Sequence, residues 1–311
     1  MKALFNMKEN YHPVSTYKVT AEYDGVRLDN CLIAKLKGLP RTKIYSIIRK
    51  GEVRVNKSRS QPSLRLRLGD IVRIPPYRTS SKSKGYINNK DLDKISESII
   101  SEEKEYLIVN KPAGYASHGG SGITGGVIEI IRELKPNYKN AQLAHRIDKD
   151  TSGCLVIALK KTFLRKLHEE IRNKDVDKVY DLIVCGQWPV GISQIKEPIY
   201  INRSANGERE ATIDSKGKEA LTSFTIVKKS SKYSLLKASI YTGRMHQIRI
   251  HTKNAGFPIL GDVKYGDEEA NKLERSNGLN RMMLHAYSIN FKNLGLKAMA
   301  KTPNSFFSFV D

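Results

Sequence analysis

The amino-acid sequence predicts an α+β fold in which a small α/β domain precedes a larger domain built on a mixed, largely antiparallel β-sheet. Over residues 25–76, apolar side chains recur first at helical and then at strand spacing, as in a small mixed domain. Beyond residue 100, strand-like segments outnumber helical ones and show no regular βαβ alternation. Few apolar residues lie between these two patterns, which indicates a linker.

In the small domain, residues 28–36 and 40–51 each carry apolar side chains at three- and four-residue intervals. Each segment ends at or just before a glycine, Gly38 or Gly51, so we expect two short helices. Three alternating segments then predict short strands: 53–56, 64–68 and 72–74.

The larger domain should be made mainly of strands. Its longest expected helix starts at Thr162 as the cap, and a shorter one covers the polar segment 242–251. The strands are expected at 106–110, 154–159, 179–185, 221–227, 234–241 and 284–291. We therefore divide the chain into a loosely held tail, the small domain, a flexible linker and the larger domain, with the bounds 1–24, 25–76, 77–95 and 96–311.

Charge is the strongest global signal. Lys and Arg number 54 against 32 Asp and Glu, a formal net charge of +22. Residues 25–76 contain 13 basic residues against three acids, and this density favours a phosphate-rich partner, because bound phosphates release their counterions. No stretch reaches the roughly 18 apolar residues of a membrane span, and residues 1–10 lack a signal-peptide core. We expect a cytoplasmic protein without a membrane segment.

The most informative stretch is residues 145–153, directly before the apolar segment 154–159. It contains two acids, an imidazole, a guanidinium and two hydroxyls, and a polar loop held on a buried strand commonly carries reactive groups. An equally open interpretation from the residues alone is that Asp148 and Asp150 cap a turn while Arg146 makes a surface ion pair.

Other chemistries lack their motifs. Residues 120–125 match GxGxxG, but the preceding strand ends too early for a dinucleotide site, and no phosphate-binding GK[ST] is present. Ser152 lacks the G-x-S-x-G context of a hydrolase, and the three cysteines show no metal-ligand spacing. We expect neither a metal nor a nucleotide cofactor.

The small domain resembles the S4 type of RNA-binding domain. The resemblance is carried by residues 27–30, 48–56 and 69–70. The alternative for Arg49 and Lys50 is that they only complement the negative end of a helix. The RNA-facing residues implied by the resemblance are Arg41, Lys43, Arg49, Lys50 and Arg54.

The larger domain resembles the RluA family of pseudouridine synthases, so the resemblance implies a pseudouridine synthase catalytic domain behind an S4-like RNA-binding domain. Met245 departs from the family pattern, which usually has Thr or Ser there. The phrases that carry the resemblance are His145-Arg146-Ile147-Asp148, Thr151-Ser152-Gly153, Lys178-Val179-Tyr180, Gly243-Arg244-Met245-His246-Gln247-Ile248-Arg249-Ile250-His251, Gly261-Asp262, Tyr265-Gly266 and Leu284-His285-Ala286.

This family isomerises uridine within RNA without gaining or losing an atom, so the resemblance implies no cofactor. The reaction needs a carboxylate acting as nucleophile or general base, and a cation that keeps it ionised. The resemblance assigns Asp148 as the catalytic aspartate, Tyr180 as the active-site tyrosine and Arg249 as the cation. For Tyr180, an ordinary core aromatic remains the alternative. The implied RNA-binding residues here are Arg146, Arg244, His246 and Gln247. For the last three, ordinary polar contacts that stabilise the fold are an equally open alternative.

The implied partner is 23S ribosomal RNA or a large-subunit precursor, modified at several uridines by a monomeric enzyme. Two alternatives remain open on the sequence. One is a pseudouridine synthase for another RNA such as transfer RNA, because motifs specify a reaction better than its target. The other is a non-catalytic RNA-binding factor for ribosome assembly.

Overall fold

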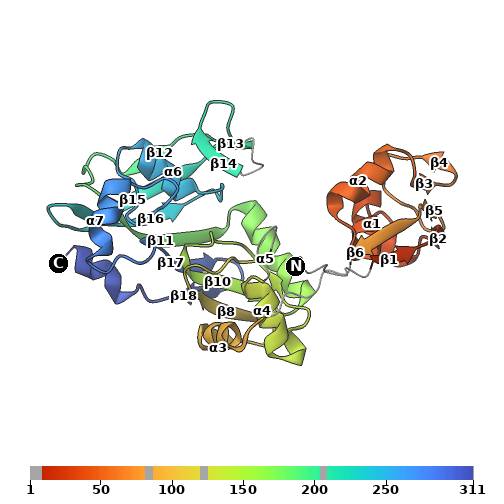
Figure 1. Ribbon diagram of the computed structural model, residues 1–311, viewed down its shortest axis with the longest axis horizontal. Helices are drawn as coiled ribbons and strands as arrows, with labels where there is room; N and C mark the ends of the chain where they lie inside the picture. The colour runs from red at the N-terminus through yellow and green to blue at the C-terminus, as the bar shows by residue number, and fades with distance from the viewer. Residues whose placement is uncertain (1–8, 81–86, 120–124, 204–208, 311) are drawn as a thin grey trace, which may run out of the picture. The chain divides into compact units, whose positions relative to one another are not determined.

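The computed structural model describes residues 9–80, 87–119, 125–203 and 209–310. The chain divides into two units, Met1–Gly85 and Tyr86–Asp311, and buried apolar side chains form separate cores within each. Both units combine helices with sheets, which confirms the predicted α+β class (Figure 1).

The smaller unit packs two short helices on a four-stranded sheet and carries a separate two-stranded ribbon. Ile44, Ile47 and Ile48 recur at helical spacing and are all buried, as the sequence predicts. Its elements are β1 (Glu9–His12), β2 (Ser15–Lys18), the 3-10 turn η1 (Ala21–Tyr23), α1 (Leu28–Lys35), α2 (Arg41–Arg49), β3 (Arg54–Val55), β4 (Ser58–Arg59), β5 (Ile71–Ile74) and β6 (Tyr77–Ser80).

The structure corrects the predicted tail and linker. Strand β2 pairs with β5 and β1 pairs with β6, so the described part of the tail, from Glu9 on, belongs to the small unit. These pairings join segments some sixty residues apart along the chain, so the composition of either segment alone does not predict them. The strand predicted at 64–68 is also wrong: only an isolated bridge at Arg65 forms there, and Leu68 is exposed. Residues 1–8 and 81–86 lie outside the described ranges.

The larger unit contains the remaining elements. The linker ends earlier than predicted, because α3 begins at Asn89, where the Asn88 side chain accepts a hydrogen bond from the Asp91 amide at 2.7 Å, and Ile95 is fully buried. The elements are α3 (Asn89–Glu97), β7 (Ile99–Glu102), β8 (Tyr106–Lys111), α4 (Val127–Leu134), η2 (Pro136–Tyr138), β9 (Gln142–Leu143), β10 (Ser152–Ala158), α5 (Lys161–Asn173), β11 (Val176–Cys185), β12 (Gln194–Lys196), β13 (Ile199–Arg203), β14 (Arg209–Ile213), β15 (Leu221–Lys229), β16 (Tyr233–Ile240), α6 (Gln247–Asn254), α7 (Glu268–Arg275), β17 (Leu284–Phe291), β18 (Leu296–Met299) and η3 (Asn304–Phe309).

A ten-stranded sheet forms the centre of this unit, in the order β12-β15-β16-β11-β17-β10-β8-β7, with β9 and β18 paired beside β10 and β17. Among its described strands, β10 and β17 run parallel and the other pairs are antiparallel, as the sequence predicts. Figure 1 shows α3 below β8 and α4 beside it, and the apolar side chains of the two helices share one buried cluster.

Three neighbouring strands of this sheet define one row of residues. Tyr180 on β11 pairs with Ala286 on β17, and Gly153 on β10 pairs with the same alanine. A Cβ added at Gly153 would lie 2.2 Å from the Ala286 carbonyl oxygen, and the glycine has a φ of +111°. Glycine is therefore required where β10 approaches β17, directly after the polar loop 145–151.

No helix in the described ranges is long and apolar enough to cross a membrane.

Candidate active site

A cleft of about 1660 Å³ opens in the larger unit, and Asp148 lies in its wall. Its lining comes from distant parts of the chain, which the sheet brings together: residues 113–118, 144–151, 171–180, 240–249, 261–264 and 279–284 contribute most of it. Eleven Lys or Arg side chains line the cleft against three Asp. The cleft therefore suits a polyanionic ligand.

The loop that carries Asp148 is fixed from one side by residues 111–117. The Ser117 hydroxyl donates to the Ile147 carbonyl at 2.8 Å and accepts from the Ile147 amide at 3.3 Å. The Lys149 carbonyl accepts from the Gly114 amide at 3.0 Å and from the Lys111 ammonium at 2.9 Å. The residues on both sides of Asp148 are thus held, which places its carboxylate in the cleft.

Arg249 joins two carboxylates. It lies on α6 and is only 6 % exposed. Its Nε and Nη2 donate to the two oxygens of Asp262 at 2.7 and 2.8 Å, and its Nη1 donates to Asp148 Oδ2 at 3.2 Å. Among the described residues, none donates to the other oxygen, Oδ1, and the Asp148 side chain is 31 % exposed. Oδ1 therefore keeps its hydrogen-bonding capacity among the described residues.

The two buried partners stabilise each other's charged forms. Burial would lower the pKa of Arg249, but the hydrogen bonds and charge of Asp262, together with Asp148, outweigh burial and raise it. Burial would likewise raise the pKa of Asp262, and Arg249 instead holds it below its ordinary value. Arg249 therefore remains a fixed cation beside Asp148.

His246 lies near the same Asp148 oxygen as Arg249. Its Nε2 is 3.9 Å from Asp148 Oδ2, and its Nδ1 is hydrogen-bonded to the Tyr265 hydroxyl at 2.9 Å. The residue has a φ of +54°, a left-handed conformation at the start of α6, and it lines the cleft. Burial lowers the pKa of His246, although Asp148 opposes the effect, so the imidazole is neutral near pH 7.

Tyr180 also borders the cleft. It lies at an irregularity in the pairing of β11 with β17 and belongs to the same buried cluster as Ile147 and Ile248. Burial and the charge of Asp148 raise the pKa of the Tyr180 phenol, so it is protonated near neutral pH. The structure thus gathers Asp148, Tyr180 and Arg249, three residues that span a hundred positions of the sequence.

The predicted RNA-binding residues of this unit differ in placement. Arg146 is exposed at the cleft, and its Nη1 donates to His118 Nε2 at 2.7 Å. Arg244 is exposed at the cleft and donates through Nε to the Glu219 carbonyl at 3.0 Å. Both keep guanidinium donors available to a ligand.

Gln247 is a correction. Its side-chain oxygen accepts from the Thr242 hydroxyl and the Arg244 amide, and its nitrogen donates to the Leu221 carbonyl and the Thr222 hydroxyl. The residue is 3 % exposed, and the amide has no capacity left. Gln247 is therefore not available to bind RNA. Its hydrogen bonds connect the start of α6 to β15.

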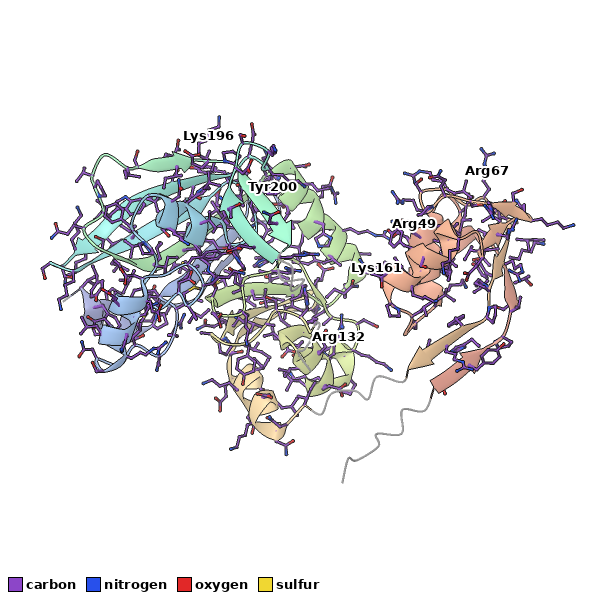
Figure 2. All side chains as sticks on the ribbon, turned by 45° about the horizontal axis from the view of Figure 1, so that its top comes forward. Arg49, Arg67, Arg132, Lys161, Lys196 and Tyr200 are labelled. Carbon is purple, nitrogen blue, oxygen red and sulfur yellow. The ribbon has the colours of Figure 1, made fainter. Side chains whose placement is uncertain are left out.

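The predicted RNA-binding residues of the small unit lie on and after α2. Arg54 is partly engaged, since its Nε donates to the Gly51 carbonyl at 3.0 Å. Figure 2 labels Arg49, which extends from α2 and lies near the Tyr45 ring. The exposed members of the set are Arg41, Lys43, Arg49 and Lys50.

Sequence reasoning gave no role to Asp262, Tyr265, Ser117 or Lys111. Asp262 and Tyr265 belong to the motifs named above. Their partners lie 13 or more residues away in the sequence, and the residue types alone do not predict such contacts. Ser117 and Lys111 carried no signal at all, because their partners are backbone atoms. The GxGxxG segment lies almost wholly outside the described ranges. In the described ranges, no cluster of His, Cys, Asp or Glu could hold a metal ion.

Fold and cleft together define an enzyme with a basic substrate cleft attached to a small helix-and-sheet unit. The family model for RNA pseudouridylate synthases matches residues 105–254, and the S4 domain model matches residues 26–72. The chain belongs to the RNA pseudouridylate synthase family, which confirms the resemblance drawn from its motifs.

Two relatives are similar over nearly the whole chain. The ribosomal large subunit pseudouridine synthase C of Haemophilus influenzae is 46 % identical over 283 residues, covering 90 % of this chain and 88 % of that protein. The protein of the same name from Escherichia coli is 41 % identical over 293 residues, covering 93 % and 92 %. A solved human structure, RNA pseudouridylate synthase domain containing 4, shares the fold with a TM-score of 0.57 and 23 % identity, over 70 % of this chain and 92 % of that one.

Proposed function

We propose that this protein converts several uridines of 23S ribosomal RNA to pseudouridine in the cytoplasm, with Asp148 as the reacting carboxylate. The relatives named for the large ribosomal subunit support the target. The observation that carries the chemistry is the Asp148 carboxylate, which lines a basic cleft and is held through Oδ2 by a buried arginine.

The reaction breaks the bond from N1 to C1′ and joins C5 to C1′. N1 gains a proton, C5 loses one, and the overall composition of the RNA is unchanged. A carboxylate beside the sugar can act as nucleophile or general base only if it is ionised. The guanidinium of Arg249 donates one hydrogen bond to this carboxylate and so compensates a negative charge there. The neutral phenol of Tyr180 and the neutral imidazole of His246 border the same carboxylate and are groups able to exchange protons there.

The base must leave its stack to reach this carboxylate, which costs a few kcal/mol. Arg146 lies at the cleft next to Asp148, and its planar guanidinium is suited to stacking in the vacated space. His118 holds one nitrogen of this guanidinium, which limits the orientations that Arg146 adopts before RNA binds.

The test follows release of tritium from C5 of uridine in unmodified 23S ribosomal RNA. The wild-type protein should release label, and Asp148→Asn, which keeps the shape of the side chain, should release none while binding the RNA as tightly. Label release that persists in Asp148→Asn would remove the proposed role of this carboxylate. Release from transfer RNA but not from 23S RNA would change the target and keep the chemistry.

A further inference from the structure

Helix α5 leads from the far end of the sheet back to the cleft. Strand β10 starts beside the Asp148 loop and runs away from it, and α5 then returns antiparallel, so that Arg172 and Lys174 at its end line the cleft. The N-cap of this helix is Lys160 and not Thr162 as predicted, and no side chain caps the helix. Because Arg172 and Lys174 line the cleft, the outer surface of α5 is continuous with the cleft at the C-terminal end of the helix.

One face of α5 is basic. Lys161, Arg165 and Arg172 lie within about 60° of one another around the helix axis, together with His168. The three cations are exposed, while Phe163, Leu164 and Leu167 bury the opposite face. From Lys161 to Arg172 this basic stripe extends about 16 Å. Lys161, labelled in Figure 2, marks its outer end.

Helix stability does not account for this arrangement. Lys161 lies at the positive end of the helix dipole, where a cation is unfavourable, and the first turn contains no acid. Lys161 and Arg165 are four residues apart, a spacing at which like charges also destabilise a helix. Neither makes an ion pair with a described residue, and Glu169 is the one exposed acid on α5. The two charges remain available to an external anion.

We propose that the basic stripe of α5, Lys161 with Arg165 and Arg172, binds the phosphate backbone of the RNA that flanks the target uridine and leads it into the cleft. The continuity with the cleft at Arg172 favours RNA over an acidic protein, because RNA already in the cleft must leave it across a neighbouring surface. The proposal rests on the proposed function for the identity of the polymer.

The experiment compares the full-length protein with the double variant Lys161→Gln and Arg165→Gln. Binding of unmodified 23S RNA should weaken about tenfold or more at moderate salt, and the slope of log affinity against log salt should become shallower by about 1.5. An oligouridylate of a few nucleotides fills only the cleft, so its affinity should change less than about twofold. The melting temperature should stay equal or rise slightly, because a like-charge pair is removed.

The matched control neutralises two exposed lysines that do not line the cleft, Lys139→Gln and Lys196→Gln. Its affinity for 23S RNA should stay near the wild-type value. An unchanged affinity and salt slope in the α5 variant would overturn the proposal, and so would an equal loss in the control or on the oligouridylate. Label release by the wild-type protein tests the proposed function separately, so the two failures are distinguishable.

Discussion

Arg249 reaches Asp148 through a single nitrogen, Nη1, at 3.2 Å, because its Nε and Nη2 are both bound to Asp262. The two bonds to Asp262 fix the plane of the guanidinium, and the remaining nitrogen, Nη1, donates to one oxygen of Asp148. Asp262 thereby acts on the candidate site through Arg249, since only 1 % of Asp262 is exposed.

Substituting Arg249→Ala should abolish turnover and also destabilise the fold. The buried Asp262 carboxylate would lose its partner, which costs about 3–5 kcal/mol of unfolding free energy. Urea denaturation measures this loss and label release measures turnover. In Arg249→Ala combined with Asp262→Ala, part of the lost stability should return while turnover stays absent, because the unpaired charge is removed but the Lys264 and Tyr265 amides lose their acceptor. Exposed Arg244→Ala is the control and should change stability by about 0.5 kcal/mol or less. Near-normal turnover in Arg249→Ala would remove the role given to this cation.

Lys111 should make stability rise with pH. The residue is fully buried, and its ammonium donates to the carbonyls of Pro112, Tyr115 and Lys149. Burial is the largest influence and lowers its pKa from 10.5 to about 7, although Asp150 and Asp148 oppose it. Between these two pKa values the unfolded chain binds a proton that the folded chain has lost, so raising the pH favours the folded state. Below about pH 7 both states bind the proton and the effect is constant.

The measurement is the unfolding free energy of the wild-type protein and of Lys111→Met, each in urea across this pH window. Relative to the variant, the wild-type protein should gain about 2–3 kcal/mol between about pH 7 and pH 9. Groups that titrate in both proteins cancel in the difference. A difference that stays flat with pH would show that Lys111 keeps its proton in the folded protein.

The α2 surface of the S4 unit should contribute to RNA affinity. Neutralising three exposed cations should make the slope of log affinity against log salt shallower by about 2–3, because fewer counterions are released on binding. Filter binding to 23S RNA at several salt concentrations measures the slope. The three substitutions are Arg41→Gln, Lys43→Gln and Arg49→Gln.

A matched control neutralises three exposed cations of the same unit that lie on its strands and turns, including Arg67, labelled in Figure 2. If affinity falls equally in both variants, the net charge of the unit and not the α2 surface determines binding. The control substitutions are Lys18→Gln, Lys57→Gln and Arg67→Gln.

Local patterns predicted those parts of the fold whose cause is local. The spacing of Ile44, Ile47 and Ile48 specifies one face of α2 whatever that face packs on, and the same holds for Phe163, Leu164 and Leu167 on α5. Local patterns did not predict the strands in the described part of the tail, because β1 and β2 form only by pairing with partners near residue 75. A short polar strand has no recognisable pattern until its neighbour is known.

The sequence by itself determined the family and the candidate carboxylate, because the phrase around Asp148 and the phrase around Arg249 each keep a recognisable order of residue types. Only the tertiary structure decided which groups act together. It showed that the Gln247 side chain bonds within the protein, that Arg249 is paired with Asp262, and that His246 lies near Asp148. The physical reason is that a hydrogen bond depends on distance and direction between side chains, and residues a hundred positions apart acquire these only when the sheet is formed.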